Sequence, residues 1–326
     1  MTDNLLEIDN LNVEYVTDDA LVYALNNFNL QVRKGEKIGL VGETGAGKTT
    51  LALSILRLLP KKVGRIVSGS IKYMNEELLD KPESYMLGLR GRRISMIFQD
   101  PMTSLNPVKS VGNQVLEVLN LHFPELSKEE KNKQVDDIFR LVGIPPERKI
   151  EYPHQFSGGM KQRIVIAMAL IAEPELLLAD EPTTALDVTI QAQILDLMKE
   201  LKTKYNSAIV LITHDLGVVA EFCDRVAVVY GGRVVEIGGV EEIFGKGHNH
   251  PYTRGLINCI PDLSGKSNRL HPISGRMSNP RIKHKGCVFA ERCSHCFEKC
   301  KNIPPKMVYE GEGHGILCHL YEQEGE

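Results

Sequence analysis

The chain has 326 residues, 42% of them hydrophobic, so it can bury a substantial core in one large domain or in a domain with an appendage. Its 39 basic and 42 acidic residues leave a formal net charge of -3, which provides no overall basic field for binding nucleic acid. The most apolar run, residues 164–172, is far shorter than the ~20 residues of a membrane helix. The acidic N-terminus does not resemble a secretory signal, so we expect a cytosolic protein.

The N-terminal part of the chain has the alternating apolar pattern of β-strands. Strands are predicted at residues 6–15 and 28–32, before a turn at Lys34-Gly35. A third strand is predicted at residues 36–42, where the chain enters a glycine-rich loop. Residues 49–59 then predict a helix that ends at Pro60, which completes a strand, loop and helix unit.

A helical pattern occupies residues 105 to 172. Ser127 and Glu130 have the spacing of a capping box, and Gly143 stands at a plausible helix end. We therefore predict a helical insert, about 100–172, within an α/β body.

Three short apolar runs follow, at residues 175–180, 207–213 and 225–230, separated by helical stretches. Such runs are typical of a largely parallel sheet covered on both faces. Gly231-Gly232 predicts a hairpin into one more strand. Beyond about residue 245 the periodicity fades while Gly, Pro, His and Cys accumulate, so we place domains at 1–245 and 246–326.

The glycine-rich loop at residues 42–49 has the sequence of a phosphate-binding loop, with glycines at both required places and Lys-Thr at its end. Lys48 is expected to reach the β- and γ-phosphates of ATP, and the Thr49 hydroxyl is suited to Mg²⁺. The expected ATP-contacting residues of this loop and helix are Gly42, Thr44, Gly45, Ala46, Gly47, Lys48, Thr49 and Thr50.

Two adjacent carboxylates, Asp180 and Glu181, follow a buried strand at its carboxyl end, the edge where open α/β sheets bind ligands. Asp180 is expected to hold Mg²⁺, and Glu181 to polarise the attacking water as general base. An Asp-Glu pair alone is weak evidence, because a solvated strand end has the same composition. Its weight depends on the motifs that accompany it.

The accompanying motifs are Phe156 to Arg163 (FSGGMKQR), Gln99 after the run ISMIF, Ala185-Leu186-Asp187, and His214 before Asp215. In this order they resemble the motif set of the ABC ATPases over residues 5 to about 240. The resemblance implies a P-loop NTPase of the ABC type, with a mostly parallel core sheet, an antiparallel β subdomain and a helical insert. A small cysteine-containing C-terminal domain would be appended to it.

The resemblance also implies a head-to-tail dimer with two ATP molecules between the subunits. Ser157, Gly158 and Gly159 would contact the ATP of the partner, and Asp187 would communicate across the interface. His214 would hold the γ-phosphate, and Gln99 would sense Mg²⁺ and water.

The resemblance further assigns a tyrosine to stacking on the adenine. Tyr15, 33 residues before Lys48, is expected in that role, with Tyr23 as a rival and a packed strand tyrosine as the alternative. One departure from the pattern is Met160, which stands where the family usually has Gln after Ser-Gly-Gly.

Three segments narrow the resemblance to the peptide and nickel importers: SGGMKQR with IAMAL, TTALDVTIQAQIL, and NHPYTRGLINCIP at 249–261. The resemblance to these importers implies an ATPase at the cytoplasmic face of the cell membrane, where it powers the import of dipeptides or oligopeptides. Partners would be a second, paralogous ATPase, two transmembrane permease subunits and, indirectly, an extracytoplasmic peptide-binding protein. Nickel or another small solute is an alternative cargo. A soluble ABC ATPase of nucleic-acid or iron-sulfur metabolism is a remote alternative, and no nucleic acid is expected.

Five of the seven cysteines lie between Cys287 and Cys318. Four of them, Cys287, Cys293, Cys300 and Cys318, are separated by five, six and seventeen residues, and Cys296 is an extra one. Four thiolates suit an iron-sulfur cluster or Zn²⁺, and spacing alone does not choose between them. A zinc site could instead use Cys296 with Cys293, Cys300 and Cys318, or could take His295, His314 or His319 in place of one thiolate. Reduced, unliganded cysteines are a further alternative.

The resemblance to peptide importers favours a [4Fe-4S] cluster on Cys287, Cys293, Cys300 and Cys318, with a structural or redox-sensing role. The remaining cysteines, Cys223 and Cys259, are interpreted as packing residues.

Overall fold

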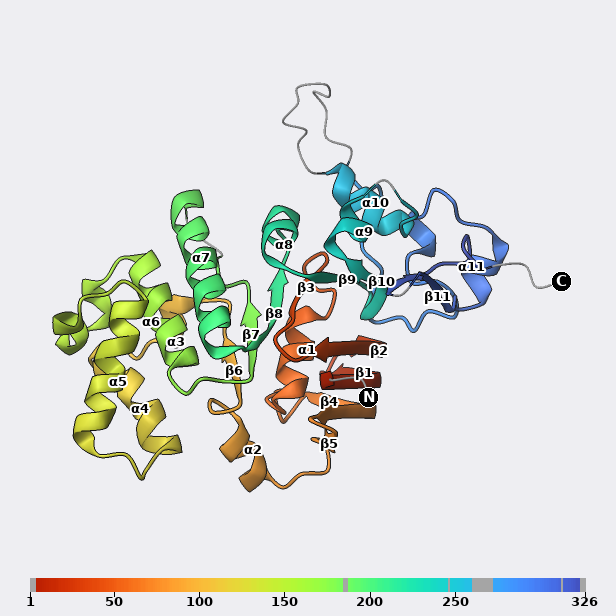
Figure 1. Ribbon diagram of the computed structural model, residues 1–326. Coiled ribbons are helices and arrows are strands. Elements are labelled where there is room, and N and C mark those ends of the chain that lie inside the picture. Colours follow the sequence, from red (N-terminus) through yellow and green to blue (C-terminus); the bar gives the residue numbers. More distant parts are fainter. Residues whose placement is uncertain (1–3, 184–186, 246, 260–271, 312, 323–326) are drawn as a thin grey trace. The chain divides into compact units, whose positions relative to one another are not determined.

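The computed structural model describes residues 4–183, 187–245, 247–259, 272–311 and 313–322. The chain divides into two compact units (Figure 1). The first contains residues 33–36 and 80–211, and the second contains residues 6–32, 37–79 and the chain from 212 onward. Among the described residues, no helix combines the length and apolarity needed to cross a membrane.

The first unit is built on two parallel strands, β6 (Ile94–Ile97) and β7 (Leu176–Asp180), with β8 (Ala208–Thr213) next to β7. All five residues of β7 are buried, which explains why it is continuously apolar up to its last residue. This arrangement brings the carboxyl ends of β6 and β7 together at one edge of the sheet.

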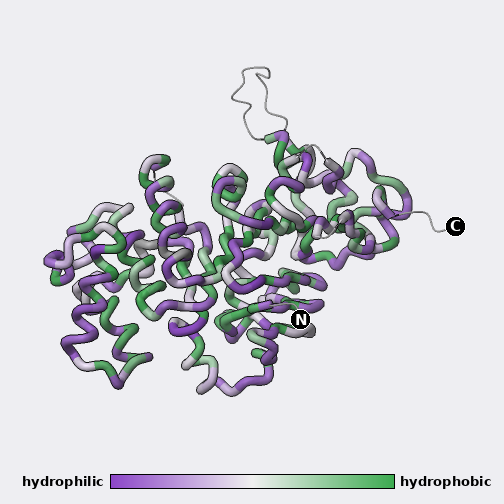
Figure 2. Tube along the Cα trace, viewed as in Figure 1, coloured by the Kyte–Doolittle hydropathy of each residue, from purple (hydrophilic) through white to green (hydrophobic). Residues whose placement is uncertain are grey.

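Helices make up most of the first unit. They are α2 (Glu83–Leu89), α3 (Pro101–Ser104), α4 (Val111–His122), α5 (Lys128–Leu141), α6 (Gly158–Leu170) and α7 (Val188–Tyr205), with 3₁₀ turns η1 (Pro146–Ile150) and η2 (Pro153–Gln155). The predicted capping box of α5 is present: Ser127 Oγ accepts from the Glu130 N–H, and the Glu130 carboxylate accepts from the Ser127 N–H. Gly143 follows α5 with φ 73°, the left-handed conformation expected at a helix end. In Figure 2, α4 and α5 carry hydrophobic and hydrophilic residues in alternation, as amphipathic helices do.

The second unit contains an antiparallel sheet of order β2-β1-β4-β5. Its strands are β1 (Asn4–Val16), β2 (Leu21–Arg33), β4 (Gly64–Tyr73) and β5 (Glu76–Glu77). Its helices are α1 (Lys48–Ile55), α8 (Leu216–Phe222), α9 (Val240–Phe244), α10 (Pro251–Asn258) and α11 (Glu298–Asn302), with a 3₁₀ turn η3 (Ala290–Arg292). Helix α1 ends four residues before the predicted Leu59, since Arg57 takes the left-handed conformation with φ 52°.

A second sheet in this unit joins the phosphate-loop strand to the C-terminal region. β3 (Lys37–Val41) pairs in parallel with β9 (Arg225–Tyr230), and β9 turns into β10 (Arg233–Gly239). The turn uses Gly231 and Gly232, both with positive φ, as the predicted hairpin requires. The C-terminal hairpin of β11 (Met307–Glu310) and β12 (His314–Leu317) then adds antiparallel to β10. The C-terminal region therefore continues the sheet that carries the phosphate loop.

Candidate active site

The phosphate loop runs from β3 into α1 and depends on glycine at two positions. A Cβ at Gly42 would lie 2.2 Å from the carbonyl oxygen of Val229, closer than real atoms approach. At Gly47, with φ 103°, a Cβ would lie 2.6 Å from the carbonyl oxygen of Ala24. Both positions therefore require glycine, because a Cβ would clash with a neighbouring backbone carbonyl even when no nucleotide is bound.

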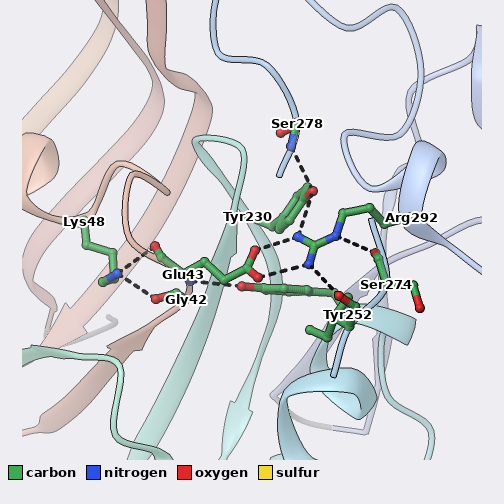
Figure 3. A network of polar contacts seen from close by, with 9 residues as sticks. Gly42, Glu43, Lys48, Tyr230, Tyr252, Ser274, Ser278 and Arg292 are labelled. Carbon is green, nitrogen blue, oxygen red and sulfur yellow. Dashed lines mark hydrogen bonds and ion pairs between the residues drawn. The ribbon is translucent and has the colours of Figure 1, made fainter. Parts of the chain in front are cut away.

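Lys48 is the first residue of α1, and its side chain turns back into the loop (Figure 3). Its ammonium donates to the carbonyl oxygens of Gly42 at 2.7 Å and Glu43 at 3.0 Å. The N-cap of α1 is Gly47, which supplies no side-chain cap. The first N–H groups of α1 and the buried Lys48 ammonium thus favour an anion at the mouth of the loop.

Tyr15 lies against the same helix. Its hydroxyl is 3.2 Å from Oγ1 of Thr50, and its ring edge faces Gly64, where an added Cβ would be 3.1 Å away. Tyr23, the rival, donates its backbone N–H to Pro280 and lines a separate pocket of about 210 Å³. Adenine stacking by Tyr15 stays a prediction.

The two predicted carboxylates stand at the carboxyl end of β7. Asp180, its last residue, is 2% exposed, and Glu181 follows in the left-handed conformation with φ 47°. Such a backbone is uncommon for a residue with a side chain and is found preferentially at functional sites. Gln99, which follows β6, donates from Nε2 to Oε2 of Glu181 at 3.0 Å. The structure thus brings together a predicted base and a predicted water-sensing amide.

The Ser-Gly-Gly motif lies at the start of α6. Ser157 is its N-cap, and Oγ accepts from the N–H of Met160 at 3.4 Å. Gly158 faces open space, whereas a Cβ at Gly159 would lie 2.7 Å from Cγ2 of Ile190 in α7. Gly158 is thus the member of the pair whose missing side chain leaves a surface open to an incoming group.

The remaining motif residues lie at helix starts or after a strand end. Asp187 caps α7, accepting from the N–H of Ile190 at 2.9 Å, while Ala185 and Leu186 lie outside the described residues. His214 is exposed after β8. The departure at Met160 is accommodated locally, because its sulfur accepts a hydrogen bond from Arg148 at 3.6 Å.

Four of the C-terminal cysteines have raised thiol pKa values. Burial raises the pKa of Cys287 to about 12 and of Cys318 to about 11, with neighbouring thiols adding to both shifts. Burial and neighbouring thiols also raise the pKa of Cys293 and Cys296. The thiols are therefore close enough to interact with one another, and Cys287 donates its N–H to the Cys300 carbonyl at 2.8 Å.

The structure gives no direct support to the metal or cluster predicted from these thiols. Within the part of the chain that is described, no three His, Cys, Asp or Glu side chains are disposed to hold one metal ion. Two of the three histidine alternatives also have other partners: His319 bonds through both ring nitrogens, to Glu322 and Ile303, and His314 bonds to Glu236. Cys223 is buried and its pKa is raised to about 12, consistent with a packing role.

Sequence reasoning missed a set of residues around Glu43. Its N–H donates to the hydroxyl of Tyr252, and its carboxylate pairs with Arg292 (Figure 3). Tyr252 lies in the quoted segment 249–261, but nothing in its spacing indicates a contact with a loop more than 200 residues earlier.

The phosphate loop at a helix start and the carboxylates after a buried parallel strand define a P-loop ATPase. Residues 25–184 match the family described as ABC transporter, and residues 235–300 match the oligopeptide/dipeptide transporter C-terminal region. Among solved structures, a dimeric ATP-binding cassette bound to ADP and Pi is similar with a TM-score of 0.65 and 28% identity, over 72% of this chain and 98% of that one. CbiO1 from Clostridium perfringens is similar with a TM-score of 0.65 and 31% identity, over 75% and 92%.

Curated relatives match nearly the whole chain. The oligopeptide transport ATP-binding protein AppD of Bacillus subtilis is 45% identical over 98% of both chains. The dipeptide transport ATP-binding protein DppD of Bacillus subtilis is 46% identical over 99% of this chain and 97% of its own. OppD of Salmonella typhimurium is 48% identical over 92% and 89%. The chain belongs to the ABC transporter ATPases, in the family of oligopeptide and dipeptide transport ATP-binding proteins.

Proposed function

We propose that this chain is the ATP-hydrolysing subunit that powers an ABC importer for dipeptides or oligopeptides. The observation that carries the proposal is near-full-length similarity to peptide transport ATP-binding proteins, including the C-terminal region typical of them. The phosphate loop, with Lys48 held inside it and α1 opening behind it, supports the nucleotide part of the proposal. Nickel or another small solute is the alternative cargo, since none of these residues contacts it.

In the proposed reaction, Glu181 acts as the general base that accepts a proton from the attacking water. The hydrogen bond from Gln99 orients its carboxylate, and a base works only when it is within reach of the proton it takes. Lys48 would bind the β- and γ-phosphates from within the loop. His214 would hold the γ-phosphate after β8.

Mg²⁺ would be held by the Thr49 hydroxyl and by Asp180, directly or through water. The donor set fits, because Mg²⁺ prefers oxygen ligands and commonly takes only one or two from the protein beside phosphates and waters. The bound ion would neutralise charge on the transferred phosphoryl group.

The Ser157-Gly158-Gly159 motif would contact ATP held by the phosphate loop of a second ATPase, with Asp187 at the same interface. The open space over Gly158 and the start of α6 support this, because a phosphate needs free backbone N–H groups and little steric bulk. The partners would be a paralogous ATPase and two permease subunits, with a peptide-binding protein acting through them. The chain would work at the cytoplasmic face of the membrane.

Reconstitution in vesicles tests this proposal. The chain is co-purified with the permeases and the second ATPase, and ATP hydrolysis is measured with and without a peptide-loaded binding protein. Hydrolysis stimulated by peptide, together with uptake of labelled peptide, is the expected result. Stimulation by nickel alone would favour the alternative cargo, and ATP hydrolysis unaffected by any solute would contradict the importer role.

We also propose that Cys287, Cys293, Cys300 and Cys318 hold a [4Fe-4S] cluster, with Zn²⁺ as the alternative. The support is chemical: four cysteines gathered in one short region form a soft donor set, and a cluster takes one thiolate per iron instead of gathering all four around one ion. Iron, sulfide and zinc are measured after anaerobic purification. Near-stoichiometric iron and sulfide would support the cluster, one zinc per chain would replace it, and the absence of all three would refute both.

A further inference from the structure

The C-terminal region reaches the phosphate loop at Glu43, the residue after the first glycine of the loop. Three groups of Glu43 are engaged: its carbonyl accepts from Lys48, its N–H donates to Tyr252, and its carboxylate pairs with Arg292 (Figure 3). Tyr252 belongs to α10, and Arg292 ends the turn η3. One loop residue thus links the phosphate-binding lysine to two residues far along the chain.

The Arg292 side chain is held in place by other contacts besides its ion pair with Glu43. Its side chain is only 4% exposed, and its guanidinium donates to both carboxylate oxygens, at 2.6 and 3.0 Å. The same guanidinium donates to the carbonyl oxygens of Ser274 at 3.1 Å and Ile273 at 3.3 Å. The two backbone carbonyls fix the position of the planar Arg292 guanidinium, which in turn fixes the Glu43 carboxylate.

Tyr252 is equally constrained. It is fully buried, and its ring packs against the rings of Tyr230 and Phe289, at centroid distances of 4.6 and 5.4 Å. Its hydroxyl accepts the Glu43 N–H at 3.0 Å. The packed rings therefore fix the position of the Tyr252 hydroxyl, and the hydroxyl in turn holds the Glu43 backbone at the start of the phosphate loop.

A third contact continues along the loop. An added Cβ at Gly45 would lie 3.2 Å from the terminal methyl of Met277, and the neighbouring Ser278 donates its N–H to the hydroxyl of Tyr230 at 3.1 Å. Residues 273–278 thus pass beside the loop while they also anchor Arg292 and Tyr230.

The ion pair of Glu43 and Arg292 should affect how the loop binds the negatively charged phosphates. Glu43 places a carboxylate in a loop that must receive the negative charges of a polyphosphate, and like charges at short range repel. Arg292 neutralises that carboxylate by pairing with it, while Lys48 donates to the carbonyls of Gly42 and Glu43.

We propose that Arg292 and Tyr252 are positioning residues of the nucleotide site, through which the C-terminal region holds the phosphate loop ready for ATP. The inference rests on the proposed ATPase function. Neither residue touches the phosphates; both act through Glu43. The C-terminal region is then part of the nucleotide-binding machinery as well as an appendage to it.

Binding of ATP to the full-length chain tests the inference in three variants: Tyr252→Phe, Arg292→Gln and the double variant Glu43→Gln/Arg292→Gln. Tyr252→Phe and Arg292→Gln should each weaken ATP binding roughly tenfold to hundredfold, because each leaves a polar or charged group of Glu43 without its partner. The double variant should bind more tightly than Arg292→Gln, because it leaves no carboxylate unpaired beside the loop. Arg281→Gln, which removes an exposed arginine of the same region, is the matched control and should bind as wild type.

A second readout separates positioning from general destabilisation. In the assembled transporter, Tyr252→Phe should raise the KM for ATP while kcat is largely retained, whereas a merely structural defect would lower the active fraction and leave KM unchanged. If Arg292→Gln does not fold, Tyr252→Phe decides, because it removes one oxygen atom. Folded Tyr252→Phe that binds ATP like wild type would overturn the inference. Wild-type chain that binds no ATP would instead overturn the proposed function.

Discussion

Gln99 donates a hydrogen bond from Nε2 to the carboxylate of Glu181 at 3.0 Å, across 82 residues of sequence. The contact exists because β6 and β7 run parallel side by side, so the residues that follow them emerge at the same edge of the sheet. Gln99 follows one strand end and Glu181 the other. The bond orients a carboxylate whose own backbone is in an uncommon conformation.

Replacement of Glu181 by Gln should abolish most hydrolysis while preserving ATP binding. The amide matches the carboxylate in shape but cannot accept the proton of the attacking water, so kcat should fall by roughly 10²–10⁴-fold. Turnover and ATP affinity are measured on the reconstituted transporter, with Glu200→Gln, an exposed position on α7, as the control. Near-normal turnover in Glu181→Gln would remove this residue from the role of base.

Gln99→Ala should lower kcat by roughly 10- to 100-fold, because a hydrogen bond to a charged group contributes about 1.5–3 kcal/mol. Gln99→Glu should be worse, since a second carboxylate beside Glu181 repels it. Steady-state hydrolysis of both variants is compared with that of Gln31→Ala, which removes an exposed amide on β2. Wild-type activity in Gln99→Ala would mean that orientation of Glu181 by this contact is unimportant.

Two glycine substitutions should separate fold from function. Gly47→Ala places a methyl group 2.6 Å from the carbonyl of Ala24 at a positive φ, so it should lower the free energy of unfolding by about 1–3 kcal/mol and disrupt the loop. Gly158→Ala meets open space at the start of α6, so stability should be unchanged or slightly raised. The ATPase activity of Gly158→Ala should nonetheless fall in the assembled transporter, because the methyl group occupies the surface proposed to receive ATP.

Thermal unfolding and ATP hydrolysis are measured on both glycine variants. A fully active Gly158→Ala would contradict the proposed contact between α6 and ATP.

Stability should decline as the pH falls below about 6.5, in part through His250. Burial lowers the pKa of this histidine to about 3, and Nδ1 accepts the N–H of Tyr252. Between pH 6.5 and 3 the unfolded chain binds a proton that the folded chain does not, so the free energy of unfolding drops as pH falls, by about 2 kcal/mol at pH 5. His250→Asn keeps a capping acceptor but does not titrate, so its unfolding midpoint should depend less steeply on pH. Parallel pH profiles for the two proteins would exclude His250 as a contributor.

Much of the local structure followed from residues close together in sequence. The capping box of Ser127 and Glu130, the helix end at Gly143 and the hairpin at Gly231-Gly232 were all predictable, since each is formed by backbone groups within a few residues. The early end of α1 was not predictable from Pro60. It depends on Arg57, whose backbone turns left-handed while its guanidinium bonds the carbonyl of Leu78, twenty-one residues away.

The sequence by itself predicted where ATP binds: the loop at 42–49, the carboxylates Asp180 and Glu181, and the Ser-Gly-Gly motif are contiguous segments whose chemistry depends on residue order. Only the tertiary structure decided how these segments are held. Glu43 was not among the residues expected to contact ATP, yet Tyr252 and Arg292 fix it, and the C-terminal hairpin β11–β12 extends the sheet of β3. The physical reason is the separation of the residues along the chain. A motif consists of residues that are neighbours in sequence. The ion pair of Glu43 and Arg292 spans 249 residues, so it forms only when sheet pairing and aromatic packing bring both residues together.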